Sequence, residues 1–239
     1  MAIIHVKNVS HSFGKEKVLD NVNLLIQEGE IFGLLGPSGA GKTTLVKLIV
    51  GILEATQGEI VISGKAVPSL ELLTDIGYMA QADALYSELS AKENLQFFAQ
   101  IYRLKKQMQR ERIDNVLKVV GLSDHANKTI NQFSGGMKRR LSLSIALLHQ
   151  PKLLILDEPT VGIDPVLRQS IWSELRKLKE DGMTIIVTTH VMDEAEKCDR
   201  LAMLRDGRII ACDTPERLKE KLRVSSLEDV FLAYGGGNL

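Results

Sequence analysis

The apolar positions along the chain follow two different spacings, which predict alternating strands and helices. Short, mostly apolar runs are typical of strands, and apolar residues three and four positions apart are typical of helices. The predicted strands lie at residues 3–9, 18–26, 30–35, 59–62, 76–79, 153–156 and 184–189. The run at 153–156 is apolar without alternation, as expected for a strand buried on both faces, and 184–189 is expected to be the next buried strand.

Turn and cap residues divide these runs. Gly14 is expected to turn between the first two strands, and residues 205–208, read as Arg-Asp-Gly-Arg, predict a hairpin. Asp164 followed by Pro165 is a typical helix start, with Asp as the cap and Pro in the first turn. A short charged helix is expected at 214–222, and the terminal glycines at 235–237 are expected to be frayed.

Residues 91–122 differ from the rest because they are charged and helical in period. Two apolar faces are visible, Leu95/Phe98/Ile101/Tyr102 and Ile113/Val116/Leu117/Val120, and Gly121 is a plausible helix stop. We interpret the segment as a helical lobe inserted into an α/β domain. The expected arrangement is a single domain over 1–239, with an α/β core and β subdomain at about 1–81 and 151–239 and a helical subdomain at about 82–150.

Composition narrows the possible partners. The formal net charge of the 239 residues is zero, so the chain as a whole lacks a strongly basic footprint for nucleic acid, and a local basic patch is the alternative that net charge leaves open. We expect no nucleic-acid partner. Cys198 and Cys212 are the only cysteines and are interpreted as reduced cytosolic thiols. The N-terminus lacks a signal-peptide layout, and no apolar run is long enough to cross a bilayer, so a cytoplasmic location is expected.

One glycine-rich stretch carries the clearest chemistry, Gly36-Pro37-Ser38-Gly39-Ala40-Gly41-Lys42-Thr43-Thr44. Its two glycines four residues apart, followed by Lys and Thr, fit a phosphate-binding loop, and the predicted strand before it and helix after it supply the required context. Backbone N–H groups and the helix start would surround a phosphate. Lys42 would reach the β- and γ-phosphates of a nucleotide, and the Thr43 hydroxyl would bind Mg²⁺. The alternative is a glycine-rich turn that matches by accident.

Two acidic residues, Asp157 and Glu158, follow the apolar run at 153–156. A magnesium–nucleotide site needs a carboxylate at the tip of a neighbouring strand, and Asp157 meets that need. Glu158 is placed to align or deprotonate an attacking water. Without the phosphate loop, a solvated strand end would be the simpler interpretation.

The stretch at 133–140, Phe-Ser-Gly-Gly-Met-Lys-Arg-Arg, contains a helix start that predicts a second anion site. Ser134 is a good N-cap, and Gly135 and Gly136 leave the helix start uncovered. An ordinary capped helix is the alternative, since the apolar residues that follow would pack in either case.

Taken together, these motifs resemble those of an ATP-binding cassette (ABC) transporter ATPase subunit, over nearly the whole chain. Besides the phosphate loop and the signature at 133–137, the matching positions are Gln81 (Q-loop), 153–158 (Walker B strand), 162–164 (D-loop) and His190 (switch loop). The resemblance implies an α/β P-loop NTPase (RecA-like) core with an N-terminal antiparallel β subdomain and an inserted helical subdomain. Two departures stand out: Phe133 and Met137 replace Leu and Gln in the signature, and Phe13 stands where adenine usually stacks on a Tyr.

The resemblance also implies a mechanism and partners. Two chains, preferably identical, would face head to tail, with each ATP between the phosphate loop of one and the signature of the other. The implied roles are phosphate binding by Lys42, Mg²⁺ binding by Thr43, Gln81 and Asp157, polarisation of water by Glu158, γ-phosphate sensing by His190 and coupling of the sites by Asp164. The chain would act peripherally on the cytoplasmic face of the membrane and power export through a separate transmembrane permease subunit, which would select the substrate.

Two further segments bear on the partner. In the family, a groove beside the Q-loop receives a helix of the membrane subunit, and candidate residues are Ala82, Leu85, Tyr86, Phe97 and Phe98, unless the two Phe side chains pack in the lobe. Residues 226–232 resemble the end of type-2 (multidrug or antibiotic) exporter ATPases, unless they form a short amphipathic helix that packs locally. The competing functions are a soluble ABC ATPase in translation or DNA repair and a regulatory subunit with little hydrolysis. One cassette without sustained heptads argues against the first, and Glu158 with His190 argues against the second.

Overall fold

The computed structural model describes residues 1–82 and 84–234, which form two compact units. One unit comprises residues 1–72 together with the chain from 184 onward, and the other comprises 73–183. No helix of the described residues is both long and apolar enough to span a membrane. The subdomain boundaries expected near 82 and 150 stay a prediction, and the expected fraying of 235–237 lies outside the described residues.

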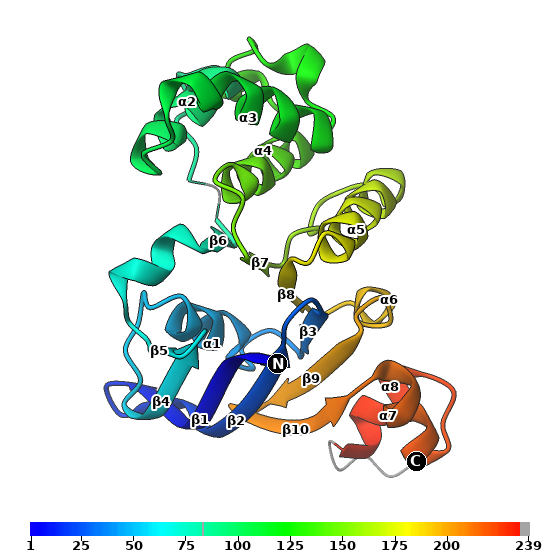
Figure 1. The fold of residues 1–239 in the computed structure, drawn as a ribbon. Helices are drawn as coiled ribbons and strands as arrows, with labels where there is room; N and C mark the ends of the chain where they lie inside the picture. The colour runs from blue at the N-terminus through cyan, green and yellow to red at the C-terminus, as the bar shows by residue number, and fades with distance from the viewer. Residues whose placement is uncertain (83, 235–239) are drawn as a thin grey trace. The chain divides into compact units, whose positions relative to one another are not determined.

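An antiparallel sheet opens the first unit (Figure 1). β1 (Ala2–Phe13) pairs with β2 (Glu16–Gln27) on one side and with β4 (Gln57–Ile62) on the other, and β5 (Lys65–Ala66) pairs with β4 at the edge of the sheet. Ile4 lies opposite both Ile26 and Ile62, so buried apolar side chains face one another across the three strands. The sheet confirms the predicted N-terminal β subdomain, and both hairpin strands run closer to the Gly14 turn than the apolar pattern indicated.

The same unit contains buried parallel strands. β3 (Ile31–Leu35) lies between β8 (Thr184–Thr189) and β9 (Arg200–Arg205), and β10 (Arg208–Asp213) is antiparallel to β9. Every residue of β3 and β8 is buried, which confirms the buried strand predicted at 184–189. The predicted hairpin at 205–208 is also confirmed, with Asp206 and Gly207 both at positive φ as a tight turn between strands requires.

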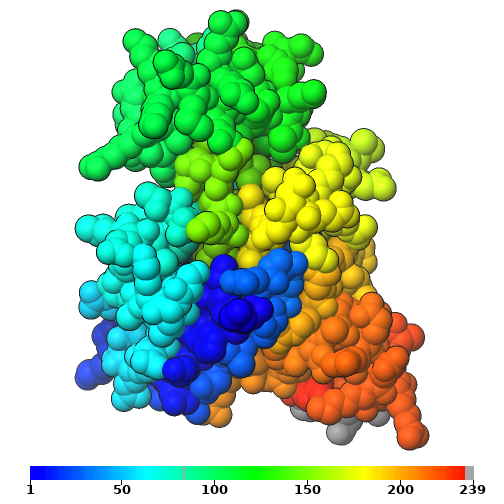
Figure 2. Space-filling model, viewed as in Figure 1, coloured from blue at the N-terminus to red at the C-terminus, as the bar shows by residue number. Residues whose placement is uncertain are grey.

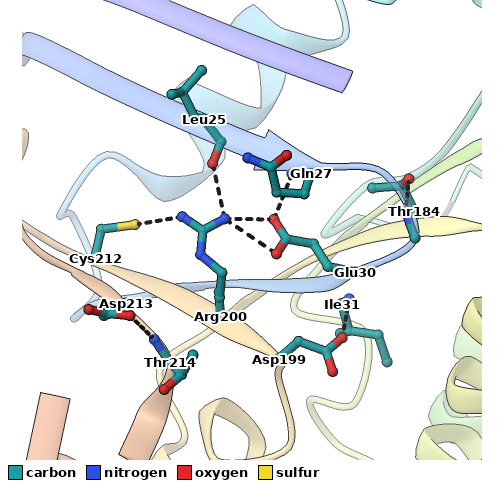
Figure 3. A network of polar contacts seen from close by, with 11 residues as sticks. Leu25, Gln27, Glu30, Ile31, Thr184, Asp199, Arg200, Cys212, Asp213 and Thr214 are labelled. Carbon is teal, nitrogen blue, oxygen red and sulfur yellow. Dashed lines mark hydrogen bonds and ion pairs between the residues drawn. The ribbon is translucent and has the colours of Figure 1, made fainter. Parts of the chain in front are cut away.

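A polar network holds the amino end of β3, the end away from the phosphate loop (Figure 3). The Arg200 guanidinium donates to both Glu30 carboxylate oxygens, at 3.0 and 3.3 Å, and Glu30 Oε1 also accepts from the Gln27 N–H at 2.7 Å. Asp199 accepts from the Ile31 N–H at 2.8 Å. These bonds join the ends of β2, β3 and β9, so the loop that enters β3 is fixed.

The helices of this unit are α1 (Lys42–Ile49), α6 (Met192–Ala195), α7 (Pro215–Leu222) and α8 (Leu227–Tyr234). The predicted helix at 214–222 is confirmed, with Thr214 as its N-cap. Leu227 and Val230 of α8 pack into an apolar cluster with Leu218 of α7 and Leu201 and Met203 of β9. In the space-filling view the orange surface of α7 lies beside the red of α8 (Figure 2). Residues 227–234 therefore form a short helix that packs locally, and the resemblance of 226–232 to the end of type-2 exporter ATPases stays a prediction.

The second unit combines two parallel strands with helices. β6 (Ile76–Met79) and β7 (Leu153–Asp157) pair in register, Met79 lying opposite Leu156. The charged segment at 91–122 is two helices, α2 (Ala91–Ile101) and α3 (Lys106–Val119), separated at Arg103, which has a positive φ. The remaining helices are α4 (Gly135–Leu147), α5 (Pro165–Glu180) and the short 3₁₀ turns Ser123–His125 and Ile130–Gln132. A further 3₁₀ turn, Leu70–Thr74, contains the residues at which the division between the units falls.

Candidate nucleotide site

The phosphate loop connects β3 to α1, as the sequence predicted. Its start is fixed from two sides: the Gly36 N–H donates to the Thr189 carbonyl at 3.3 Å, and a Cβ on Gly36 would lie 2.2 Å from the Leu204 carbonyl oxygen. Gly39 and Gly41 have φ of 81° and 102°, a backbone conformation that side chains with a Cβ rarely adopt. Pro37, Ser38 and Gly39 form an exposed tip, so the loop presents its backbone outward.

Lys42 lies folded into this loop. Its side chain is buried, and its Nζ donates to the carbonyls of Gly36 at 2.7 Å and Pro37 at 3.0 Å. One positive charge is therefore held against the loop backbone at the start of α1, where the helix already presents a partial positive charge. Thr43 and Thr44 follow in the first turn of the helix, and both are half-buried. The arrangement attracts an anion such as a phosphate group.

His190 and Phe13 belong to the same unit as the loop. Leu35 and Thr189 are paired at the ends of the parallel strands β3 and β8, so Gly36 and His190 leave the sheet at the same edge. Thr189 is fixed there by a hydrogen bond from its hydroxyl to the Glu194 carboxylate at 2.6 Å. Phe13 ends β1 with 52% of its surface exposed, and the His11 ring contacts it edge-on at 4.7 Å between centroids. An exposed ring fixed by one neighbour can stack on a flat ligand.

The carboxylates lie in the other unit, at the end of β7. Asp157 is completely buried, and Glu158 follows it with a φ of 52°, an uncommon conformation for a residue with a side chain. The Gln81 side-chain amide donates to Glu158 Oε2 at 3.1 Å. Gln81 and Glu158, 77 positions apart, are thus brought together.

Tyr78 is a neighbour of this group that the sequence analysis did not identify. Burial, together with the charge of Asp157, raises the pKa of Tyr78 to about 12. The phenol therefore stays neutral. Its position in the strand at 76–79 was predicted, but nothing in the apolar pattern indicated that it lies beside Asp157.

The signature residues start α4. The Ser134 hydroxyl accepts from the Met137 N–H at 3.3 Å, which confirms the predicted N-cap. A Cβ on Gly135 or Gly136 would meet no other heavy atom within 4 Å. Internal packing does not require these glycines, and the helix start is open to a molecule that approaches it.

Asp164 has a local role that the structure resolves. Its carboxylate accepts from the Leu167 N–H at 3.0 Å and caps α5, as predicted. Val161 and Val166 beside it are 50% and 80% exposed, so this loop presents apolar side chains outward.

The candidate docking residues form an aromatic group in the second unit. The rings of Tyr86 and Phe97 are 4.6 Å apart, and those of Phe97 and Phe98 are 5.4 Å apart. Tyr86 and Phe97 are 48% and 36% exposed, whereas Phe98 is half-buried in the lobe. Ala82 is exposed and Leu85 is half-buried.

The donor types present fit a magnesium ion. Thr43, Gln81 and Asp157 offer hydroxyl, amide and carboxylate oxygens, which are the hard ligands that Mg²⁺ prefers. Among residues 1–82 and 84–234 there is no group of three His, Cys, Asp or Glu side chains that would hold a metal alone.

Comparisons with known proteins agree with these motifs. A family model described as "ABC transporter" matches residues 19–161. The chain is 41% identical over 219 residues to the probable multidrug ABC transporter ATP-binding protein YbhF of Escherichia coli (strain K12), covering 91% of this chain and 38% of that protein. It is 39% identical over 241 residues to the linearmycin resistance ATP-binding protein LnrL of Bacillus subtilis (strain 168), covering 96% of this chain and 78% of that protein. The chain therefore spans little more than a third of YbhF and most of LnrL.

A solved structure gives the same result for the fold. The dimeric structure of a post-hydrolysis state of the ATP-binding cassette MJ0796, bound to ADP and Pi, superposes with a TM-score of 0.81 at 33% identity, covering 88% of this chain and 98% of that chain. The predicted fold class, a P-loop NTPase with an antiparallel β subdomain and a helical subdomain, is confirmed. With a matching family model and relatives near 40% identity, the chain belongs to the ABC transporter family as an ATP-binding cassette.

Proposed function

We propose that this chain binds and hydrolyses ATP and thereby powers export through a separate transmembrane subunit. The observation that carries the proposal is the buried Lys42, with its Nζ 2.7 Å from the first carbonyl of an outward-facing phosphate loop. Two relatives bear names that refer to multidrug transport and linearmycin resistance, which supports an exporter. The membrane partner would select the transported molecule.

Nucleotide binding follows from the residues of the loop. The backbone N–H groups of 36–44 and the Lys42 ammonium would hold the phosphates, and the exposed Phe13 ring would stack on the adenine. The oxygens of Thr43, Gln81 and Asp157 would hold Mg²⁺, which when bound neutralises charge on the phosphates.

Glu158 is the proposed general base. Its carboxylate already accepts a hydrogen bond from Gln81 at 3.1 Å, and a carboxylate so placed can take a proton from water as the water attacks the γ-phosphate. His190, exposed at the edge where the phosphate loop starts, would contact the γ-phosphate.

The open start of α4 is the basis for a composite site. We infer that Ser134, Gly135 and Gly136 bind the ATP held by a second chain, so that two chains close head to tail. The absence of packing around both glycines supports a surface that another molecule covers. The apolar loop around Asp164 would meet its counterpart and couple the two sites. A homodimer is the preferred form, and the dimeric MJ0796 cassette is the related precedent.

The location follows from the partner. The chain would lie peripherally on the cytoplasmic face of the membrane, with Tyr86 and Phe97 among the residues that contact the permease. Their rings are exposed and fixed against each other, which suits a helix that inserts an apolar side chain.

The test is the variant Glu158→Gln. Gln is nearly isosteric but cannot accept the proton, so hydrolysis should stop while phosphate binding remains. ATP would then stay at both composite sites, and a transient dimer should become stable in ATP but not in ADP. Size-exclusion chromatography with light scattering measures this, and the dimer fraction should rise with ATP concentration.

A second substitution identifies the surface that closes. Adding Ser134→Arg should restore the monomer, because a bulky cation would fill the anion site at the helix start. A double variant that still dimerises in ATP would contradict the signature assignment. A Glu158→Gln protein that stays monomeric with its ATP sites filled would contradict the homodimer, and wild-type protein without any ATP hydrolysis would contradict the proposed activity.

A further inference from the structure

A single buried arginine joins the two loops that carry Gln81, Asp157 and Glu158. β6 and β7 are paired as far as Met79 and Leu156, and the backbone of both strands then leaves the ladder. Arg139 Nη1 donates to the carbonyls of Ala80 and Gln81, both at 2.8 Å. Its Nη2 donates to the carbonyls of Asp157 at 2.7 Å and Glu158 at 2.8 Å. One guanidinium thus continues the pairing of the two strands beyond the point where the backbone ladder ends.

The geometry requires an arginine. A guanidinium is a flat fork with five N–H donors and can serve two acceptors on each of two terminal nitrogens, whereas a lysine has three donors on one point. Arg139 is only 7% exposed, so its charge is held inside the protein by these acceptors. Four short bonds from one charged group fix the four carbonyls strongly.

The packing of α4 places this side chain. Gly77 lies in β6, and a Cβ at this position would be 2.2 Å from the Ala146 carbonyl oxygen. Only glycine at position 77 therefore permits α4 to lie this close to β6. Arg139 lies in the second turn of α4, five residues after the Ser134 cap. The helix that starts at the signature is therefore bonded directly to the backbone of the proposed catalytic residues.

We propose that Arg139 is a positioning residue for hydrolysis, which holds Gln81 and Glu158 in register and couples the signature helix to them. Glu158 has a positive φ, an unfavourable conformation that the surroundings must maintain, and Arg139 binds the carbonyl of that same residue. Arg139 also binds the carbonyl of Gln81. The backbones of Gln81 and Glu158 are therefore both fixed, and their side chains are held within the 3.1 Å hydrogen bond that joins them. The inference rests on the proposed function, since it assigns Arg139 to that reaction.

The neighbouring Arg140 is a matched control on the same helix. Its guanidinium donates to the carbonyls of Val120 and Gly121, at 3.0 and 3.1 Å, and so holds the end of α3. Arg139→Lys and Arg140→Lys each preserve the charge and remove the fork. Both should lower stability, but only Arg139→Lys should change the site.

The measurements separate chemistry from folding. We expect Arg139→Lys to lower kcat for ATP hydrolysis by about 30- to 100-fold, the effect of displacing a catalytic group by about 1 Å. The Kd for MgATP should stay within about threefold of wild type, because the buried Lys42 and its loop carry most of the phosphate binding. Arg140→Lys should keep kcat within about threefold of wild type.

Hydrogen–deuterium exchange measures how firmly the backbone of the two loops is held, and it does not depend on ATP hydrolysis. Arg139→Lys should raise exchange in peptides covering 76–82 and 153–161, and Arg140→Lys should raise it around 117–123 instead. A neutral second variant, Arg139→Gln, should raise exchange in the same two peptides.

The outcomes distinguish this inference from the proposed function. An inactive wild type contradicts the proposed function, while the exchange data still decide whether Arg139 joins the two loops. Unchanged exchange in both peptides, or a kcat of Arg139→Lys close to wild type in an active protein, overturns the inference. Failure of both Arg139 variants to fold, seen in thermal melts, also overturns it and makes Arg139 a folding residue.

Discussion

Gly36→Ala tests the phosphate loop through a contact that the structure measures. The added Cβ would lie 2.2 Å from the Leu204 carbonyl oxygen, whereas Cβ atoms in proteins stay beyond 3.0 Å. The loop start must therefore move by roughly 0.8 Å (3.0 − 2.2) or push β9 away. Overpacking of this kind costs about 1–3 kcal/mol of folding free energy.

The same displacement would reach the nucleotide. Gly36 supplies a carbonyl that accepts from Lys42 Nζ at 2.7 Å, so moving Gly36 moves the charge that is meant to meet the phosphates. Because misplacement by about 1 Å can cost a positioned group up to 100-fold, we expect the Kd for MgATP to rise by about 10- to 100-fold. Fluorescence titration with a nucleotide analogue measures the affinity, and urea unfolding measures the stability.

Gly29→Ala is the control at the other end of β3. Gly29 also has a positive φ, but a Cβ there would meet no atom within 4 Å, so Ala costs about 1 kcal/mol of backbone strain without a clash. Its affinity for MgATP should equal that of wild type. A Gly36→Ala protein that binds MgATP with a Kd within threefold of wild type would refute the reasoning. The loop would then bind phosphate equally well after its start had been displaced.

Three other predictions follow from single contacts. Lys42→Ala should abolish tight binding of ATP, and retention of wild-type affinity in fluorescence titration would contradict the role of Lys42. Arg200→Ala should cost about 3 kcal/mol in urea unfolding, because Glu30 is then left buried without its partner at 3.0 Å, while ATP affinity of the folded protein stays unchanged. Burial lowers the pKa of His149, so the unfolded chain binds a proton that the folded chain excludes, and the free energy of unfolding should decrease as the pH falls below about 6.5. His149→Asn should lose this part of the pH dependence, which urea titrations at several pH values would reveal.

The strands were predictable because burial on one or both faces leaves a direct pattern in the sequence. Residues 153–156 have no polar interruption, and all of them are buried in β7. The elements that the pattern missed are short. β5 has two residues and α6 has four, and neither is long enough to show a period. The division of 91–122 at Arg103 was also missed, because a left-handed residue other than glycine leaves no compositional mark.

The residues of the candidate site also differ in how well the sequence predicts them. A residue whose role depends on its neighbours in sequence is predictable, and one whose role depends on contacts with distant segments is not. The phosphate loop was predictable because its glycines, its lysine and the following helix start are contiguous. Arg139 and Arg140 show the opposite case. They are the same residue type in adjacent positions, and one step along a helix rotates the side chain by about 100°. That rotation directs Arg139 to the ends of β6 and β7 and Arg140 to the end of α3. Which of the two bears on catalysis depends on how α4 lies over β6, and that in turn depends on the missing side chain at Gly77. A sequence pattern can therefore identify the groups that are expected to contact ATP. Arg139, which we propose holds them in place, can be identified only once the packing of α4 is known.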